Sequence, residues 1–254
     1  MTAELINLPG LLALPAAATR QTHRLTKKDI AAQWDESRAD ARLLTKVITQ
    51  ATIVGVLSPQ TIGVRGFADD DRRVDMIPVL ELQLVEQAKL SDRIRAAELL
   101  HRSMPRPAII GLVVPNGEMY LSLALTRLSR TEEGRSVVEA SVTVPVGDIA
   151  PEAVRVGRLA QTDLAALHRD LVRTVAANGR PASVALTAAE AVALRQRLAA
   201  LDAELLAVVR DAGREKNIQR RIDLNTRAKS LRTEIDSVRG SLYAAGTPKQ
   251  EAQQ

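Results

Sequence analysis

The sequence predicts a mixed α/β protein in which flanking helices cover a central sheet and a C-terminal antiparallel helical hairpin follows. Three observations indicate this class. Short β-branched or alternating segments occupy residues 25–150, helical periodicity then replaces them, and two heptad patterns fill the last part of the chain. The 254 residues are 46% hydrophobic and 26% charged, which is the composition of a folded soluble protein.

Changes in composition divide the chain into five segments. The first contains Pro9 and Pro15 with little periodicity, so we expect an extended arm there. The polar C-terminal tail is expected to be flexible. The segments are the N-terminal arm (1–24), the α/β sheet domain (25–150), a linking helix and loop (151–186), the helical hairpin (187–243) and the tail (244–254).

The sheet domain is expected to begin with helices and two short strands. A helical region covers residues 26–48, and a polar break at 35–37 separates it into two short helices. Residues 51–57 and 61–65 are rich in β-branched side chains, with a Ser-Pro turn signal between them. We therefore predict a strand in each.

A third predicted strand, residues 77–85, carries polar side chains that bear on function. Its leucines at 80, 82 and 84 lie on one face, and Glu81 and Gln83 lie on the other. We expect the strand to be half buried. The simplest interpretation places Glu81 and Gln83 on its solvent face.

A helix and three strands complete the predicted sheet domain. Asn116-Gly117 is a strong hairpin signal that joins two of these strands. The elements are a helix (91–104), an apolar strand buried on both faces (108–114), its hairpin partner (119–126) and a last strand (137–144).

The rest of the chain is expected to be helical. An amphipathic helix at 162–177 ends at Asn178-Gly179, and Thr187 caps a long helix that Gly213 separates from a second one. Both long helices have apolar seams at alternating steps of four and three residues, which indicates a coiled coil. The seams are Leu194, Leu198, Leu201, Leu205 and Val208, then Leu224, Ala228, Leu231, Ile235, Val238 and Leu242. The arms, about 35 to 40 Å long, either fold back on each other or dimerise with another chain.

The composition argues against several classes of site. Cysteine is absent and aromatic residues make up 2% of the chain, which disfavours disulfide scaffolds, thiolate zinc sites, cysteine nucleophiles and base-stacking RNA surfaces. The sequence contains no Walker loop, dinucleotide-binding glycine pattern or His-Glu-x-x-His motif. His23, His101 and His168 lie on an arm and two different helices, so we expect surface or boundary positions rather than a catalytic triad.

The sequence also predicts a cytoplasmic location. It contains no run of the roughly 18 apolar residues that a membrane helix needs. The apolar stretch at 11–18 is interrupted by Pro15 and is not preceded by basic residues, so it does not fit a secretory signal.

Positive charge is concentrated around the start of the second hairpin helix. The chain has a net charge of +5, and seven basic and two acidic residues within 214–232 account for all of it. Such a stripe favours a nucleic-acid backbone or an acidic protein partner, and the alternative is an ordinary solvated helix face. The predicted binding residues are Arg214, Lys216, Arg220, Arg221, Arg227, Lys229 and Arg232.

The predicted order of helix, three strands, helix and strand resembles the core of a large nuclease superfamily with an Asp…Glu-x-Lys active site. Glu81 lies at the motif position, with Asp75 or the aspartates at 69–71 upstream, and Gln83 stands in place of the lysine. The resemblance implies that Asp75 and Glu81 bind Mg²⁺, which activates water for phosphodiester attack. Gln83 lacks the positive charge but can still orient water, so these three residues form the candidate catalytic set.

Short motifs along nearly the whole chain resemble a bacterial family catalogued as a domain of unknown function. The motifs are Asn7-Leu8-Pro9, Lys27-Lys28, the strands around 57–62 and 79–84, Met104-Pro105-Arg106-Pro107, and the helix at 215–225. The resemblance implies genes beside helicases and DNA methyltransferases in restriction-like or phage-defence islands. It transfers no catalytic residues to this chain.

Together these observations predict an accessory subunit of a bacterial antiviral defence or restriction-modification-like complex that acts on DNA. The subunit would dock on a helicase or methyltransferase, with its basic hairpin touching the partner or DNA, and would need no cofactor. Two alternatives stay open. The first is a Mg²⁺-dependent nuclease that uses Asp75 and Glu81, and the second is a structural protein that forms a homodimer through its hairpin.

Overall fold

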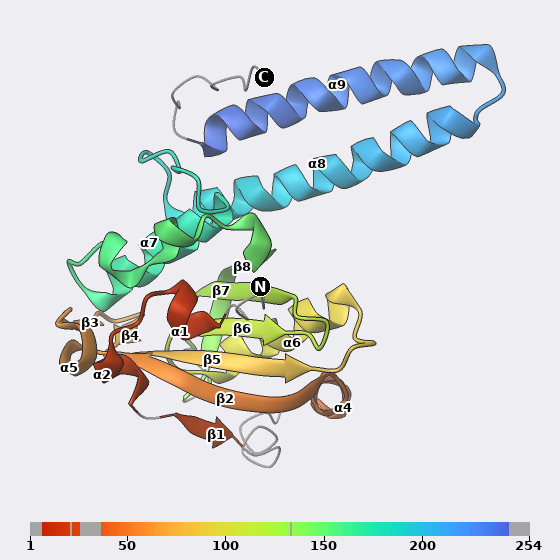
Figure 1. Ribbon diagram of the computed structural model, residues 1–254. Coiled ribbons are helices and arrows are strands. Elements are labelled where there is room, and N and C mark those ends of the chain that lie inside the picture. The colour runs from red at the N-terminus through yellow and green to blue at the C-terminus, as the bar shows by residue number, and fades with distance from the viewer. Residues whose placement is uncertain (1–6, 21, 26–36, 133, 244–254) are drawn as a thin grey trace, which may run out of the picture.

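The computed structural model describes residues 7–20, 22–25, 37–132 and 134–243. A six-stranded mixed sheet with the order β1-β2-β5-β6-β7-β8 forms its centre (Figure 1). Its strands are β1 (His23–Leu25), β2 (Ile48–Leu57), β5 (Ile77–Leu84), β6 (Ile109–Val113), β7 (Met119–Leu128) and β8 (Ser136–Pro145). β5 and β6 pair in parallel, and the other neighbouring pairs are antiparallel. The predicted class is therefore confirmed.

Helices cover both faces of the sheet. One face packs against α4 (Arg38–Val47) and α6 (Leu90–Ser103), and α6 is also the crossover that makes β5 and β6 parallel. The other face packs against α1 (Leu8–Leu11), α7 (Leu164–Ala176) and the start of α8. The remaining elements are α2 (Ala16–Thr19), α5 (Pro59–Ile62), the two-stranded sheet of β3 (Phe67–Ala68) and β4 (Arg73–Val74), the 3-10 segments Val146–Asp148, Pro151–Val154 and Val156–Arg158, and the hairpin helices α8 (Ala188–Arg214) and α9 (Ile218–Leu242).

The part of the N-terminal arm that the structure describes from residue 7 to residue 20 is packed rather than extended, contrary to the sequence prediction. Asn7 caps the single turn of α1, because its side chain accepts a hydrogen bond from the Gly10 N–H at 2.8 Å. This turn places Leu8 and Leu12, both fully buried, against the sheet. The low periodicity of the segment misled the prediction, since a one-turn helix is too short to show it.

The main consequence of this packing is that α1 covers the face of β5 that carries Glu81. Leu80, Leu82 and Leu84 lie on the face toward α6, as their alternation predicts. Glu81 and Gln83, however, lie on the face that α1 covers, and both are half-buried. The predicted solvent-facing interpretation of these two side chains is therefore wrong.

The predicted second strand, residues 61–65, is also wrong, because α5 extends to Ile62 and the chain then turns at Gly63 without forming a strand before β3. Pro59 occupies the first turn of this helix, and the Ser58 N–H donates to the hydroxyl of Thr61 at 2.8 Å in a reciprocal capping box. These local caps outweigh the β-branched composition. Between α4 and α6 the main sheet therefore contains only β2 and β5 among the described residues, and the expected three-strand order of a nuclease core is not reproduced.

The C-terminal helices form the predicted antiparallel hairpin, which projects from the sheet domain (Figure 1). Their seams face each other, with Leu198, Leu201, Leu231 and Ile235 buried between the helices. Leu194 and Leu242 instead join the core of the sheet domain and anchor the hairpin to it. Gly213 does not end the first helix, which continues to Arg214 before the turn at residues 215–217.

Two predicted segments lie outside the described residues. These are the first part of the predicted helical region, residues 26–36, which includes the motif Lys27-Lys28, and the tail at 244–254.

The turn after α7 requires glycine at position 179, because the backbone there is left-handed and because a side chain would clash with Ala150. Gly179 has a φ of +69°, and a Cβ there would lie 2.6 Å from the backbone nitrogen of Ala150. Gly117 has a φ of +89° but no atom within 4 Å of such a Cβ. We expect Gly117→Ala to cost about 1 to 2 kcal/mol through left-handed backbone strain, and Gly179→Ala to cost about 1 to 3 kcal/mol more through the clash. Urea unfolding of the two variants measures the difference, and equal losses of stability would contradict the tight docking of this turn.

Candidate functional site

Asp75, one of the predicted metal ligands, is held in an arginine clamp just before β5. Its carboxylate accepts hydrogen bonds from Arg106, from Nη2 at 3.0 Å and also from Nε, and from Arg73 Nε at 3.2 Å. The hydrogen bond from Arg106 lowers the pKa of the Asp75 carboxyl below its usual value. Two cations thus occupy the face that a metal would need.

Glu81 has a structural partner as well. Its Oε1 accepts a hydrogen bond of 2.8 Å from the Leu8 N–H at the start of α1. The four-residue step from Ile77 to Glu81 alone covers about 13 Å, so the structure does not bring Asp75 and Glu81 to a common ion. Gln83 follows one step further along β5, half-buried. Among the described residues, no group of three or more His, Cys, Asp or Glu side chains could hold a metal.

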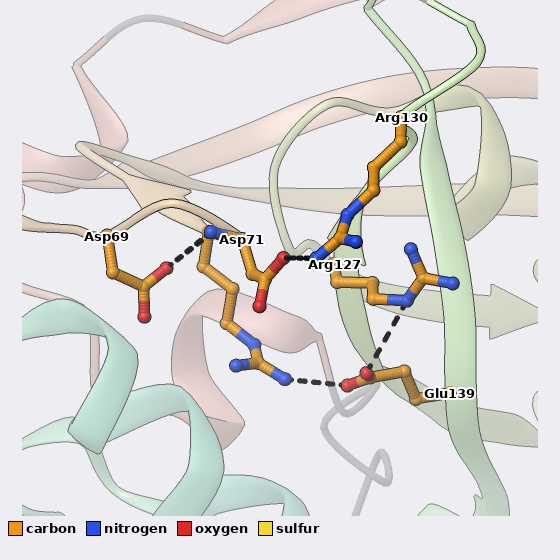
Figure 2. A network of polar contacts seen from close by, with 6 residues as sticks. Asp69, Asp71, Arg127, Arg130 and Glu139 are labelled. Atoms are coloured by element: carbon orange, nitrogen blue, oxygen red, sulfur yellow. Dashed lines mark hydrogen bonds and ion pairs between the residues drawn. The ribbon is translucent and has the colours of Figure 1, made fainter.

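Two of the three aspartates at 69–71 make structural contacts (Figure 2). Asp69 Oδ1 accepts from the backbone N–H groups of Asp71 and Arg72 at 3.0 and 2.6 Å, which closes the β3–β4 turn. Asp71 Oδ1 accepts from Arg130 Nη2 at 3.0 Å. Turn geometry and an ion pair therefore explain the carboxylates of Asp69 and Asp71, and Asp70 is exposed.

Two of the three histidines are far more buried than the sequence suggested. His101 on α6 and His168 on α7 are 1% and 3% exposed. His101 Nε2 lies 3.3 Å from the hydroxyl oxygen of Ser122, which accepts a hydrogen bond from Thr143. Burial lowers the pKa of His101 to about 3, with a contribution from His168.

His168 is neutral for a similar reason. Its pKa is lowered to about 4, mainly by burial and also by the neighbouring Arg169, while a hydrogen bond with the backbone of Ala108 acts in the opposite direction. Its Nε2 has no hydrogen-bond partner among the described residues. No local sequence pattern indicates the burial of these two rings, because neither histidine stands in a recognisable motif.

A cavity of about 210 Å³ lies beside His168. Its walls come from β4, the adjoining ends of β7 and β8, α7, and the first residues of α8. The charged residues in its lining are Arg72, Arg73, Arg127, Arg169 and Glu139. These positions are spread over nearly a hundred residues of sequence, so no local motif could have revealed them.

The hairpin carries the predicted basic residues on exposed positions. Arg227 is paired across the hairpin with Glu204 at 2.6 Å, which makes it a structural residue. The other six have no ion pair among the described residues, and they are Arg214, Lys216, Arg220, Arg221, Lys229 and Arg232. The predicted stripe thus divides into one stabilising arginine and six available cations.

The end of the hairpin where α8 and α9 connect also exposes apolar side chains that do not belong to the heptad seams. We call residues 206–222, around the connection of α8 and α9, the hairpin tip. Four of its large apolar residues point to solvent: Leu206 (73% exposed), Val209 (44%), Ile218 (67%) and Ile222 (51%). They lie off the seam positions, so the helical pairing leaves them uncovered.

Comparison with known proteins gives one family. Neither the curated proteins nor the solved structures contain a match to the chain. Within the described residues, no helix combines the length and the apolar character needed to cross a membrane. The family model described as "Domain of unknown function (DUF4391)" matches residues 12–235, from the residue after α1 to the later part of α9. Because this match covers both the sheet domain and most of the hairpin, the chain belongs to the DUF4391 family.

Proposed function

We propose that this protein is a non-catalytic accessory subunit of a bacterial antiviral defence or restriction-modification-like complex that acts on DNA. In this proposal the hairpin tip docks on a helicase or DNA methyltransferase subunit in the cytoplasm. The observation that carries it is the combination of exposed apolar residues and available cations at the hairpin tip. The DNA-directed setting rests on the family resemblance of the sequence motifs.

The hairpin tip has the composition of a protein-docking surface. Leu206, Val209, Ile218 and Ile222 are not needed to pair the helices, because Leu198, Leu201, Leu231 and Ile235 already form that core. Apolar side chains bordered by charge are typical of an interface centre with a polar rim.

The charge of the tip favours an acidic partner surface. Arg214, Lys216, Arg220 and Arg221 all lie within the tip and have no ion pair among the described residues. Charge complementarity of this kind accelerates association and selects the partner. The same cations can approach a DNA phosphate backbone once the subunit is docked.

The candidate catalytic residues do not favour an enzyme. Asp75 is bound by Arg73 and Arg106, and Glu81 by the Leu8 N–H, so both carboxylates have roles in the fold. A non-catalytic role for the chain agrees with these contacts.

Docking is tested with purified helicase and methyltransferase subunits from the genes beside this one. We expect one of them to bind the full chain, and Ile218→Ser with Ile222→Ser to weaken binding at least about tenfold, which is 1.4 kcal/mol. Val184→Ser, an exposed apolar position outside the hairpin, is the matched control.

The charge of the tip is tested separately. Arg220→Ser with Arg221→Ser should weaken binding of the partner subunit and reduce the salt dependence of that binding, with Arg158→Ser as the control.

Three outcomes would overturn the proposal. The first is that neither subunit binds. The second is a homodimer that the two isoleucine substitutions dissolve, which would assign the tip to self-association. The third is plasmid nicking with Mg²⁺ or Mn²⁺ that Glu81→Ala abolishes, which would restore the nuclease hypothesis.

A further inference from the structure

The cavity beside His168 is separate from the hairpin tip and is built as a binding site. It lies where the β3–β4 turn, the ends of β7 and β8, α7 and the start of α8 meet. Its volume of about 210 Å³ corresponds to about seven water molecules at roughly 30 Å³ each. This volume accommodates a phosphate with a small attached group rather than a complete dinucleotide.

Four arginines converge on this cavity against a single lining carboxylate, so its lining carries a formal charge of 4 − 1 = +3. Glu139 holds Arg72 at 2.7 Å and Arg127 at 3.8 Å, as Figure 2 shows for Arg127. Arg169 stacks over the ring of Phe67 at 5.8 Å. A guanidinium has five N–H donors, so each arginine keeps donors for a ligand while its position is fixed.

The N-terminus of α8 adds backbone donors to the same wall. Thr187 and Glu190 form a capping box that satisfies the N–H groups of these two residues. The N–H groups of Ala188 and Ala189, which line the cavity, have no acceptor among the described residues. Because α8 is 27 residues long, its dipole adds about half a positive charge at this end.

His168 contributes ring surface to the cavity wall and no polar atom that a ligand can reach. The residue is 3% exposed, and its Nε2 is fully buried without a hydrogen-bond partner among the described residues. A ligand in the cavity is therefore recognised by the arginines and the N-terminus of α8, and not by this ring.

We propose that this cavity binds the phosphate group of a small phosphorylated ligand. The phosphate accepts hydrogen bonds from the arginines and the first N–H groups of α8. This chemistry occurs in free sugar phosphates and at the 5′-phosphorylated end of a nucleic acid. The site does not depend on the proposed docking function, since its residues lie outside the hairpin tip.

Isothermal titration of the full chain at constant ionic strength tests the site. We expect inorganic phosphate and ribose 5-phosphate to bind, and ribose, which lacks the phosphate, to give no heat. Arg169→Ala should reduce binding of both phosphates at least tenfold, whereas Arg158→Ala, an exposed control, should not.

A 5′-phosphorylated oligonucleotide, compared with its 5′-hydroxyl form, distinguishes the two sources of the ligand. A preference for the phosphorylated end assigns the site to nucleic-acid termini, and binding of free ribose 5-phosphate alone assigns it to a metabolite. Absence of binding by the unmodified chain to both would overturn the proposal without reference to any variant. Binding that persists in folded Arg169→Ala would overturn it as well.

Discussion

Lowering the pH from 7 to 5 is expected to reduce the free energy of unfolding by about 4 kcal/mol, about 2 kcal/mol from each buried histidine. His101 and His168 have folded-state pKa values of about 3 and about 4, below the usual 6.5. Between these values the unfolded chain binds protons that the folded chain does not. The contribution of the two neutral rings to the free energy of unfolding is therefore fully present above pH 6.5. It falls as the pH is lowered, until the folded-state pKa of each ring is reached.

Urea titrations at pH 7, 6 and 5 measure this loss. Replacing one ring, in His168→Gln, should halve the decrease between pH 7 and pH 5, and adding His101→Gln should nearly remove it. His23→Gln is the matched control, since His23 lies exposed on β1. A decrease that is the same in all of these variants would contradict the burial of the two rings.

Substituting Leu8 by alanine is expected to cost about 3 kcal/mol, the typical loss for a leucine removed from a packed core. Leu8 is fully buried on the face of the sheet that carries Glu81. Its side chain fills the space over Gly111, where a Cβ would lie 2.8 Å from Leu8 Cδ1. The loss should be large because neither the sheet nor α1 can collapse into that space without breaking the bond to Glu81.

Urea unfolding at pH 7 measures this effect, with Val184→Ala as the control. Val184 is 88% exposed, so its substitution should change stability by less than about 0.5 kcal/mol. If Leu8→Ala were as mild as Val184→Ala, the arm would contribute little to the core. Glu81 would then be free to face solvent, as the strand pattern alone suggested.

The functional interpretation depends on these contacts. Glu81 on β5 and Asp75 before it have the residue types of a metal site, but tertiary contacts engage both of them with donors from distant parts of the chain. The hairpin tip instead exposes apolar side chains that the pairing of its helices does not need, and the cavity gathers four arginines around a single lining carboxylate. We therefore place the functional surfaces there.

Local physical rules determined several elements from the sequence alone. The Asn116-Gly117 turn joins β6 to β7 as expected, and the heptad seams predict both helices of the hairpin and their antiparallel pairing. These predictions succeeded because each depends on neighbours within one or two turns of chain. The error at residues 61–65 has the same origin, since the Ser58 cap was a local signal that β-branched composition obscured.

Only the tertiary structure decided what covers each surface. Alternation placed Glu81 opposite the leucines of β5, but the arm that covers Glu81 lies more than seventy residues earlier in the chain. The burial of His168 and the meeting of Arg72, Arg127 and Arg169 at the start of α8 likewise depend on how separate elements pack. Side-chain periodicity specifies which face of an element is apolar, whereas burial and convergence of charge follow from long-range packing that periodicity does not encode.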